Sequence, residues 1–240
     1  MDDGPRDPET AAALLKLSHD QGIRQVALTS HFDCERMAAE EYLTRRAEAF
    51  EELKAALDGA YPDTELKLGA EIMYHPSLRE ENLRPLCLEG TDLLLLEFRG
   101  DQVPPFAEDL FLDLQAEGIT PLIAHAERYW FLYRDPRILA HWISLGAFAQ
   151  VNAAAVLGND SRAQWARKLL KWNLAQVVAS DAHSLQRRPP MLREAYGLIS
   201  RKLGAETVRS LQSGADALFR GELPDIGQVH IPRQILGKWL

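Results

Sequence analysis

Apolar, strand-like runs alternate with helical segments along the whole chain, and this alternation constrains the fold more than any other feature. Strands are expected at residues 25–28, 66–70, 93–96, 121–124, 148–151 and 177–179, with helical patterns between them. Short links between alternating strands and helices are typical of a parallel sheet with right-handed crossovers. The unbroken apolar run in DLLLLEF fits a strand that is covered on both faces. The sequence therefore predicts an α/β fold.

Helix signals and the lack of a linker support this prediction. Asp7 followed by Pro8 is typical of a helix start, because an acceptor side chain precedes a proline in the first turn. This helix is expected to reach residue 21 and to end at Gly22, and further helices are expected at 35–57, 106–117 and 162–171. Since no linker or repeat interrupts the pattern, we expect residues 1–240 to form a single domain.

Composition excludes several classes of protein. Hydrophobic residues make up 46% of the 240 residues, which is enough for a sizeable core, and the net charge of −8 argues against a nucleic-acid partner held by a broad basic surface. The two cysteines, Cys34 and Cys87, form no C-x-x-C pair, so we expect them to be packing residues in a reducing compartment. Without a signal peptide or an apolar run of transmembrane length, we expect a cytoplasmic protein with no membrane insertion.

A polar residue is expected just past the carboxyl end of strand after strand. These residues are His31, Glu71, Glu97, His125, Asn152, Asp181 and His183. In parallel α/β barrels these ends meet on one face, which holds the active site. Three imidazoles and three carboxylates on one face predict a multinuclear metal site, and such mixed donors suit zinc, manganese or iron. Two cations about 4 Å apart can clamp a phosphoryl group and lower the pKa of a bound water.

Each of these residues also has a simpler interpretation. Glu71 or Glu97 alone could pair with a lysine or cap a helix, and His31 could be a histidine of a surface loop. Asp181 could be a helix N-cap. Their joint placement favours the metal site. His75, His141 and His230 do not follow a strand end, and we expect them at surface or packing positions.

Two arginines extend the predicted site. Arg128 follows His125 in HAERY, and Arg188 follows His183 in SLQRRPP. Guanidinium groups beside a metal site suit bidentate phosphate binding, and the two prolines after Arg188 would stiffen its loop. For Arg187 we expect a surface salt bridge instead.

Taken together, the motifs resemble one known family. They are DDGP near the start, TSH at 29–31, GAEI at 69–72, EF at 97–98, IAHAERY at 123–129, QVN at 150–152 and ASDAH at 179–183. This set is similar to the bacterial protein-tyrosine phosphatases of capsule and exopolysaccharide operons, within the polymerase-and-histidinol-phosphatase (PHP) superfamily. The resemblance covers nearly the whole chain in order, and the combination of DDGP, HxERY and SDxHxxxxRPP is more specific than any single motif.

The resemblance implies a fold, a cofactor and a substrate. The fold would be a distorted (β/α)7 PHP-type barrel with up to three metals, usually Mn2+, with Fe, Zn or Mg as alternatives. The substrate would be phosphotyrosine on the tail of a bacterial tyrosine autokinase that controls polysaccharide export. By resemblance, Glu71 would bridge two metals. Glu97 and His125 would complete the second metal site, and Asp181 would serve the first.

The resemblance also assigns the rest of the site. Asp3, His31 and His183 would hold the third metal, and Arg128 and Arg188 would bind the phosphate, so that His125 and the two arginines form the implied catalytic set. Hydroxide at the metals would attack the phosphorus in line. A phenol leaves at moderate pKa, so the tyrosine needs little help from a proton donor.

No cysteine nucleophile is expected. A Cys-x5-Arg loop would need arginine at position 40 for Cys34 and at position 93 for Cys87, and the residues there are Glu40 and Leu93. This agrees with a metal-dependent mechanism.

One family motif is not seen in this sequence. Members begin with a strand that carries a His-x-His motif shortly before DDGP, whereas this sequence starts at Met1, directly before DDGP. We therefore expect the first strand to be missing, one metal site to be depleted, and a strand edge to be open. A start codon assigned too late is the favoured explanation, and a truncation or a degenerate, inactive copy are the alternatives.

Two rival functions remain open at this point. One is a small-molecule phosphomonoesterase such as histidinol phosphatase, and the other is a catalytically impaired relative that binds phosphotyrosine without turning it over. Homo-oligomers occur in the family, and the charged helix around Glu40–Glu41 and Arg45–Arg46 would be a contact face. The same charges also fit a solvated helix.

Overall fold

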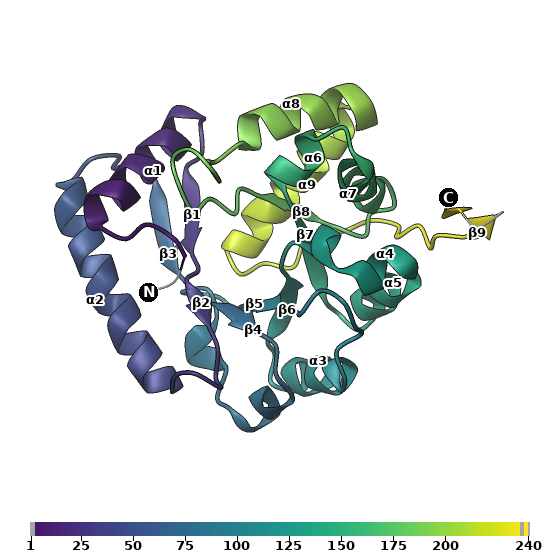
Figure 1. Cartoon of the computed structure of the whole chain (residues 1–240), viewed down its shortest axis with the longest axis horizontal. Coiled ribbons are helices and arrows are strands. Elements are labelled where there is room, and N and C mark those ends of the chain that lie inside the picture. The colour runs from purple at the N-terminus through teal and green to yellow at the C-terminus, as the bar shows by residue number, and fades with distance from the viewer. Residues whose placement is uncertain (1–2, 236–237, 240) are drawn as a thin grey trace.

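The computed structural model, which describes residues 3–235 and 238–239, has a mixed α/β architecture built on parallel sheets (Figure 1). The strands are β1 Gln25–Leu28, β2 His31–Phe32, β3 Glu65–Leu68, β4 Glu71–Met73, β5 Leu93–Glu97, β6 Thr120–Ile123, β7 Phe148–Asn152, β8 Val177–Ala179, β9 Gln234–Ile235 and β10 Lys238–Trp239. The α-helices are α1 Pro8–Asp20, α2 Ala39–Leu57, α3 Ala107–Ala116, α4 Trp130–Arg134, α5 Arg137–Ser144, α6 Ala153–Leu157, α7 Ser161–Lys171, α8 Leu192–Leu203 and α9 Ala205–Phe219. Short 3-10 turns are η1 Pro76–Glu80, η2 Arg84–Leu86 and η3 Ala126–Arg128.

The predicted α/β fold with a parallel sheet is confirmed, and the sheets of the described residues do not close into a barrel. Six parallel strands form one sheet in the order β2-β4-β5-β6-β7-β8, and β1 pairs with β3 in a second parallel sheet. The outer strands β2 and β8 are not joined to each other, so the sheet stays open. A small antiparallel pair, β9 and β10, lies near the C-terminus.

The two parallel sheets meet end to end. The N–H of Gly69 donates to the carbonyl of Leu28 at 2.9 Å, and the N–H of Glu71 donates to that of Ser30 at 3.1 Å, so backbone bonding continues across the junction. Helix α2 packs over it, because the Tyr42 hydroxyl donates to the Ser30 carbonyl at 2.8 Å. A Cβ on Gly69 would lie 3.1 Å from the methyl group of Thr29, which explains the small residue at this crossing.

The helix starts follow local capping. The Asp7 side chain accepts from the N–H of Thr10 at 2.7 Å, which confirms the predicted start of α1. The prediction for α2 was four residues too early. The helix starts later because the chain forms a turn at Asp33. The Asp33 side chain accepts from the N–H of Glu35 at 3.0 Å, and its carbonyl accepts from the N–H of Arg36 at 3.0 Å. The helix therefore begins only at Ala39.

An aromatic cluster supports the carboxyl end of β5. Trp142 of α5 is fully buried, with its ring centroid 5.3 Å from that of Phe98 and 5.4 Å from that of Phe111. The N–H of Phe98 also donates to the hydroxyl of the buried Tyr129 at 3.0 Å. The EF and HAERY motifs are thus fixed against each other by the core.

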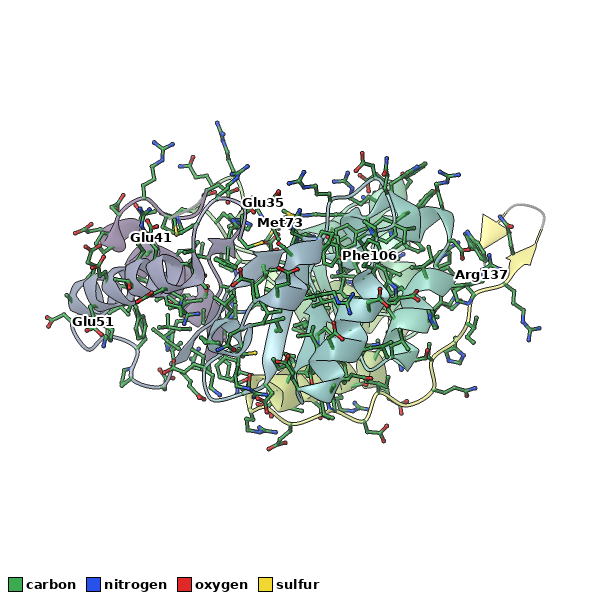
Figure 2. The ribbon with its side chains drawn as sticks, turned by 90° about the horizontal axis from the view of Figure 1, so that it is seen from below. Glu35, Glu41, Glu51, Met73, Phe106 and Arg137 are labelled. Carbon is green, nitrogen blue, oxygen red and sulfur yellow. The ribbon has the colours of Figure 1, made fainter. Side chains whose placement is uncertain are left out.

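Glu41 and Glu51 of α2 mark one end of the molecule and Arg137 of α5 lies toward the other (Figure 2).

Within the described residues, no helix is both long and apolar enough to cross a membrane. The predicted packing role of the cysteines is confirmed. Cys87 is buried in the hydrophobic core, and the half-buried Cys34 packs against that core.

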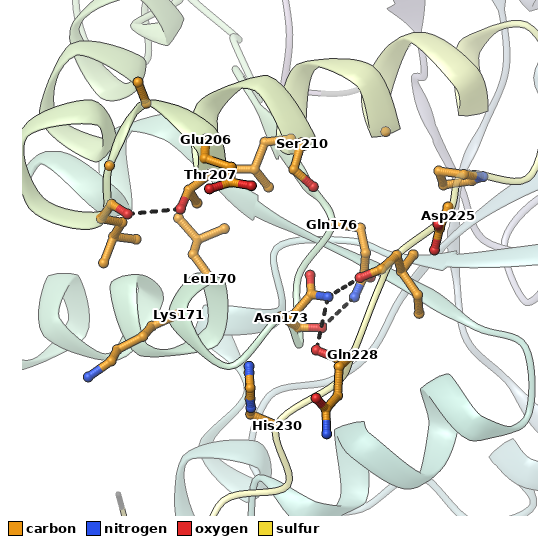
Figure 3. Close-up of a pocket in the computed structure, with 17 residues that line it drawn as sticks. Leu170, Lys171, Asn173, Gln176, Glu206, Thr207, Ser210, Asp225, Gln228 and His230 are labelled. Atoms are coloured by element: carbon orange, nitrogen blue, oxygen red, sulfur yellow. Dashed lines mark hydrogen bonds between the residues drawn. The ribbon is translucent and has the colours of Figure 1, made fainter.

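A cavity of about 660 Å³ lies between α7, α9 and the segment 224–230 (Figure 3). Gln176 lines it and directly precedes β8, whereas Asp181 follows β8, so the cavity is at the opposite end of this strand from the predicted site. The Asn173 amide donates to the carbonyl of Ile226 and ties the segment to the α7–β8 loop.

Candidate metal centre

Neighbouring strands bring three of the predicted residues together. His31 opens β2 and is the register partner of Glu71, which opens β4, and Glu97 closes β5 opposite Met73 of β4. His31 and Glu71 therefore begin short strands and do not follow strand ends as predicted, because β1 and β3 each resume as a second strand after two residues. Since register partners point to the same face, their side chains meet.

His125 completes this group from β6. Its Nε2 lies 2.8 Å from Glu71 Oε1 and 3.2 Å from Glu97 Oε1, and its side chain is 2% exposed. Its backbone has φ 31° and ψ 55°, the left-handed region that is unusual for a residue with a side chain. This conformation ends the strand and starts η3, which aims the imidazole at the two carboxylates.

The charges of this buried group are interdependent. Burial alone would lower the pKa of His125, but its hydrogen bonds to Glu71 and Glu97 raise it to about 9. Burial likewise opposes ionisation of Glu97, yet the hydrogen bond from His125 brings the pKa of Glu97 below its ordinary value. The protonated imidazole thus occupies the position of a cation between two carboxylates.

A second group lies beside the first and shares His31. Its Nδ1 is 3.4 Å from Asp3 Oδ1, and the Nε2 of His183 is 3.3 Å from the same oxygen. The other ring nitrogen of His31 points to the first group, with Nε2 at 3.8 Å from Glu71 Oε2 and 4.0 Å from Glu97 Oε2. The two groups are therefore continuous.

Both predicted arginines form ion pairs with Asp181. Its Oδ2 accepts from Arg128 Nη2 at 2.6 Å and from Arg188 Nη2 at 2.7 Å. Burial would raise the pKa of Asp181, but the two guanidinium groups and His183 hold it below the ordinary value. Arg188 also reaches Asp3 at 3.2 Å, so the arginines border both groups of possible ligands.

The sequence pattern placed Asn152 at a strand end without a role in the site, and it did not single out Glu127. Asn152, at the end of β7, donates its side-chain amide to the same Oδ2 of Asp181. Glu127 is 5% exposed, accepts from the backbone N–H of Asn152 at 3.3 Å, and has its pKa raised by burial. The position of Asn152 at a strand end was a sequence signal for that residue. The alternation of strands and helices gave no signal for Glu127, a buried acid inside η3.

The residues present fit a metal centre. Ligand atoms of Asp3, His31 and His183 lie within 4.8 Å of one another, and so do those of His31, Glu71 and Glu97. Carboxylate oxygens and imidazole nitrogens are the donors that Mn, Fe and Zn take in proteins. Buried acids without a matching cation are costly, and a bound divalent ion would offset that cost.

The sequence matches a family described as "Capsular polysaccharide synthesis, CpsB/CapC" over residues 1–217. Similar curated proteins include tyrosine-protein phosphatase YwqE of Bacillus subtilis, 31% identical over 227 residues, with 92% of this chain and 88% of the relative covered. Tyrosine-protein phosphatase CpsB of Streptococcus agalactiae is 30% identical over 220 residues, with 88% and 90% covered. A crystal structure from a study of YwqE and of CpsB from Streptococcus pneumoniae, described as metal-dependent tyrosine phosphatases, is also similar. It superposes with a TM-score of 0.87 at 27% identity and covers 98% of this chain and 96% of that one. The chain belongs to the CpsB/CapC family of capsular polysaccharide synthesis proteins.

Proposed function

We propose that this protein is a metal-dependent protein-tyrosine phosphatase that acts in capsular or exopolysaccharide synthesis. The observation that carries the proposal is the convergence of two groups of imidazole and carboxylate ligands beside Arg128 and Arg188. Membership in a family whose curated relatives are tyrosine-protein phosphatases supports it.

The residues of the site divide into two roles. The metals would be held by Asp3, His31, Glu71, Glu97, His125, Asp181 and His183. Metals bound there supply charge neutralisation and an activated hydroxide for attack on phosphorus.

Arg128 and Arg188 bind the phosphoryl oxygens. Both guanidinium groups now donate to Asp181, so phosphate binding exchanges one oxyanion for another. The tyrosine oxygen leaves as a phenolate or takes a proton from water, because its pKa is moderate.

Several finer features belong to the proposal. The metal is Mn2+, and the substrate is phosphotyrosine on the tail of a bacterial tyrosine autokinase. Residues 1–240 act as one domain. The open sheet, together with β1 and β3, is an arc of a distorted PHP-type barrel. We place the protein in the cytoplasm, with homo-oligomers as its assembly.

The test compares His125→Ala with His141→Ala after loading with manganese. His125 contacts both Glu71 and Glu97, whereas His141 is half exposed on α5, with Glu108 at 3.5 Å and the Ser144 hydroxyl at 3.4 Å. We expect His125→Ala to lose phosphate release from a phosphotyrosine peptide and to bind less manganese per chain, with an unchanged circular dichroism spectrum. His141→Ala should behave as the unmodified protein. Near-full activity of His125→Ala would overturn the metal assignment, and faster turnover of histidinol phosphate than of the peptide would overturn the substrate class.

A further inference from the structure

Most exposed large apolar residues of the described chain lie in the segments that follow strands of the candidate site. Five of the eight follow the carboxyl ends of β5, β6 and β8, namely Val103, Phe106, Trp130, Tyr133 and Leu185. Phe106 is labelled to the right of Met73 in Figure 2. Single exposed apolar residues are normal on any protein, but a group beside a site marks an interaction surface.

Trp130 and Tyr133 form a preorganised aromatic surface within this group. Their rings are stacked, with centroids 5.0 Å apart and planes inclined by 16°. Tyr133 in turn meets the buried Trp165 edge-on at 5.5 Å, and the backbone N–H of Trp130 donates to the carbonyl of Gly100 at 2.6 Å. The surface is thus held from behind, although the Trp130 side chain is 55% exposed. Rigid aromatic surfaces bind partners at a low cost in conformational entropy.

The chain places this surface next to the phosphate arginines. Trp130 opens α4 two residues after Arg128, which ends η3, and Leu185 is three residues before Arg188 on the same loop. An extended peptide advances about 3.3–3.6 Å per residue. One or two residues of such a peptide span about the same length of chain as separates Arg128 from Trp130.

We propose that Trp130, supported by Tyr133, binds an aromatic or aliphatic side chain that flanks the phosphotyrosine of the substrate peptide, and so selects among phosphotyrosine sites. The inference rests on the proposed phosphatase function. The occupant is a phosphopeptide, because Trp130 is two residues from Arg128, which with Arg188 holds a carboxylate oxygen, and an apolar partner alone would not use these arginines.

The test uses two phosphotyrosine peptides of equal net charge, one with alanine and one with tyrosine and leucine around the phosphotyrosine. Affinities are measured by fluorescence anisotropy, and phosphate release is measured after manganese loading. We expect the protein to bind the aromatic-flanked peptide about tenfold more tightly, which is the scale of one aromatic contact with its buried area. Trp130→Ala should lower that preference to about twofold or less. Leu112→Ala removes another exposed apolar side chain, from α3, and should keep the preference.

Equal affinity of the unmodified protein for both peptides would overturn the proposal, and so would a full preference in Trp130→Ala. Binding to phosphatidylglycerol vesicles that Trp130→Ala abolishes, with the peptide preference unchanged, would assign the surface to a membrane and also overturn it. Failure of the phosphatase function has a different signature, because neither peptide would release phosphate while the difference in affinity would still be measured.

Discussion

The buried ion cluster predicts how metal removal changes the pH dependence of stability. In the metal-free protein the pKa of His125 is raised from 6.5 to about 9 by Glu71 and Glu97, against the effect of burial. Protonation of His125 therefore stabilises the fold fully below about pH 6.5, and this contribution is lost as the pH rises through about 9. Since one pKa unit corresponds to about 1.4 kcal/mol, the contribution is roughly 3 kcal/mol.

Urea unfolding of the protein in EDTA, at intervals between pH 6 and pH 9.5, measures this loss. The free energy of unfolding should fall by roughly 3 kcal/mol across the range. The manganese-loaded protein should show a much weaker dependence, because a metal binds the neutral imidazole and replaces its proton. His125→Gln should remove the dependence on pH, and His141→Gln, which changes an exposed histidine of α5, should keep it.

The result that would refute this reasoning is an equal fall in the free energy of unfolding for His125→Gln and for the unmodified protein. The pH dependence would then come from other groups. A flat profile for the unmodified metal-free protein would show instead that His125 stays neutral between the two carboxylates.

Three further predictions follow from single contacts. Arg128→Ala should raise KM for a phosphotyrosine peptide by tenfold or more, the scale of a lost charge-assisted hydrogen bond, and leave manganese content by mass spectrometry largely unchanged. Arg187→Ala, which removes the exposed arginine next to Arg188, should leave KM as it is. Asn152→Ala should lower the free energy of unfolding of the metal-free protein by about 1–3 kcal/mol in urea titrations, because a buried carboxylate loses a donor; no change would mean that water replaces the amide. Cys87 should resist N-ethylmaleimide in the native protein, because burial raises its pKa to about 11, while the half-buried Cys34 should be labelled first in peptide mapping.

The sequence predicted the order of the elements because hydrophobic periodicity reports burial directly. The expected strands at 93–96, 121–124 and 148–151 match β5, β6 and β7 within one residue at each end. The split of the strands around His31 and Glu71 was not predictable, since it depends on the helix packed over the junction, where Tyr42 bonds a carbonyl. Sheet closure is likewise a property of long-range pairing that local patterns do not report.

The grouping of the predicted ligands followed from one general rule, that the ends of parallel strands meet at one edge. The rule needs only strand order, and the rings of His31 and His183, which are distant in sequence, have centroids 5.8 Å apart, although His31 opens a strand. It could not supply the partners of Asp181, because side-chain hydrogen bonds depend on rotamers that no periodic pattern encodes. Asn152 was therefore placed at a strand end without its bond to Asp181, and the contact of Glu127 with the backbone N–H of Asn152 was not predicted.

The backbone at the site explains why local rules stop there. His125 and Asp181 both adopt positive φ, at 31° and 48°, although neither is glycine. Such conformations cost about 1–3 kcal/mol each and persist only where the surroundings hold them. At His125 the fully buried Tyr129 and Ala126 flank the turn, and at Asp181 three side-chain donors converge on one oxygen. The rest of the fold therefore stabilises a conformation that the local sequence disfavours, which is expected where side chains are aimed at a ligand and not at the core.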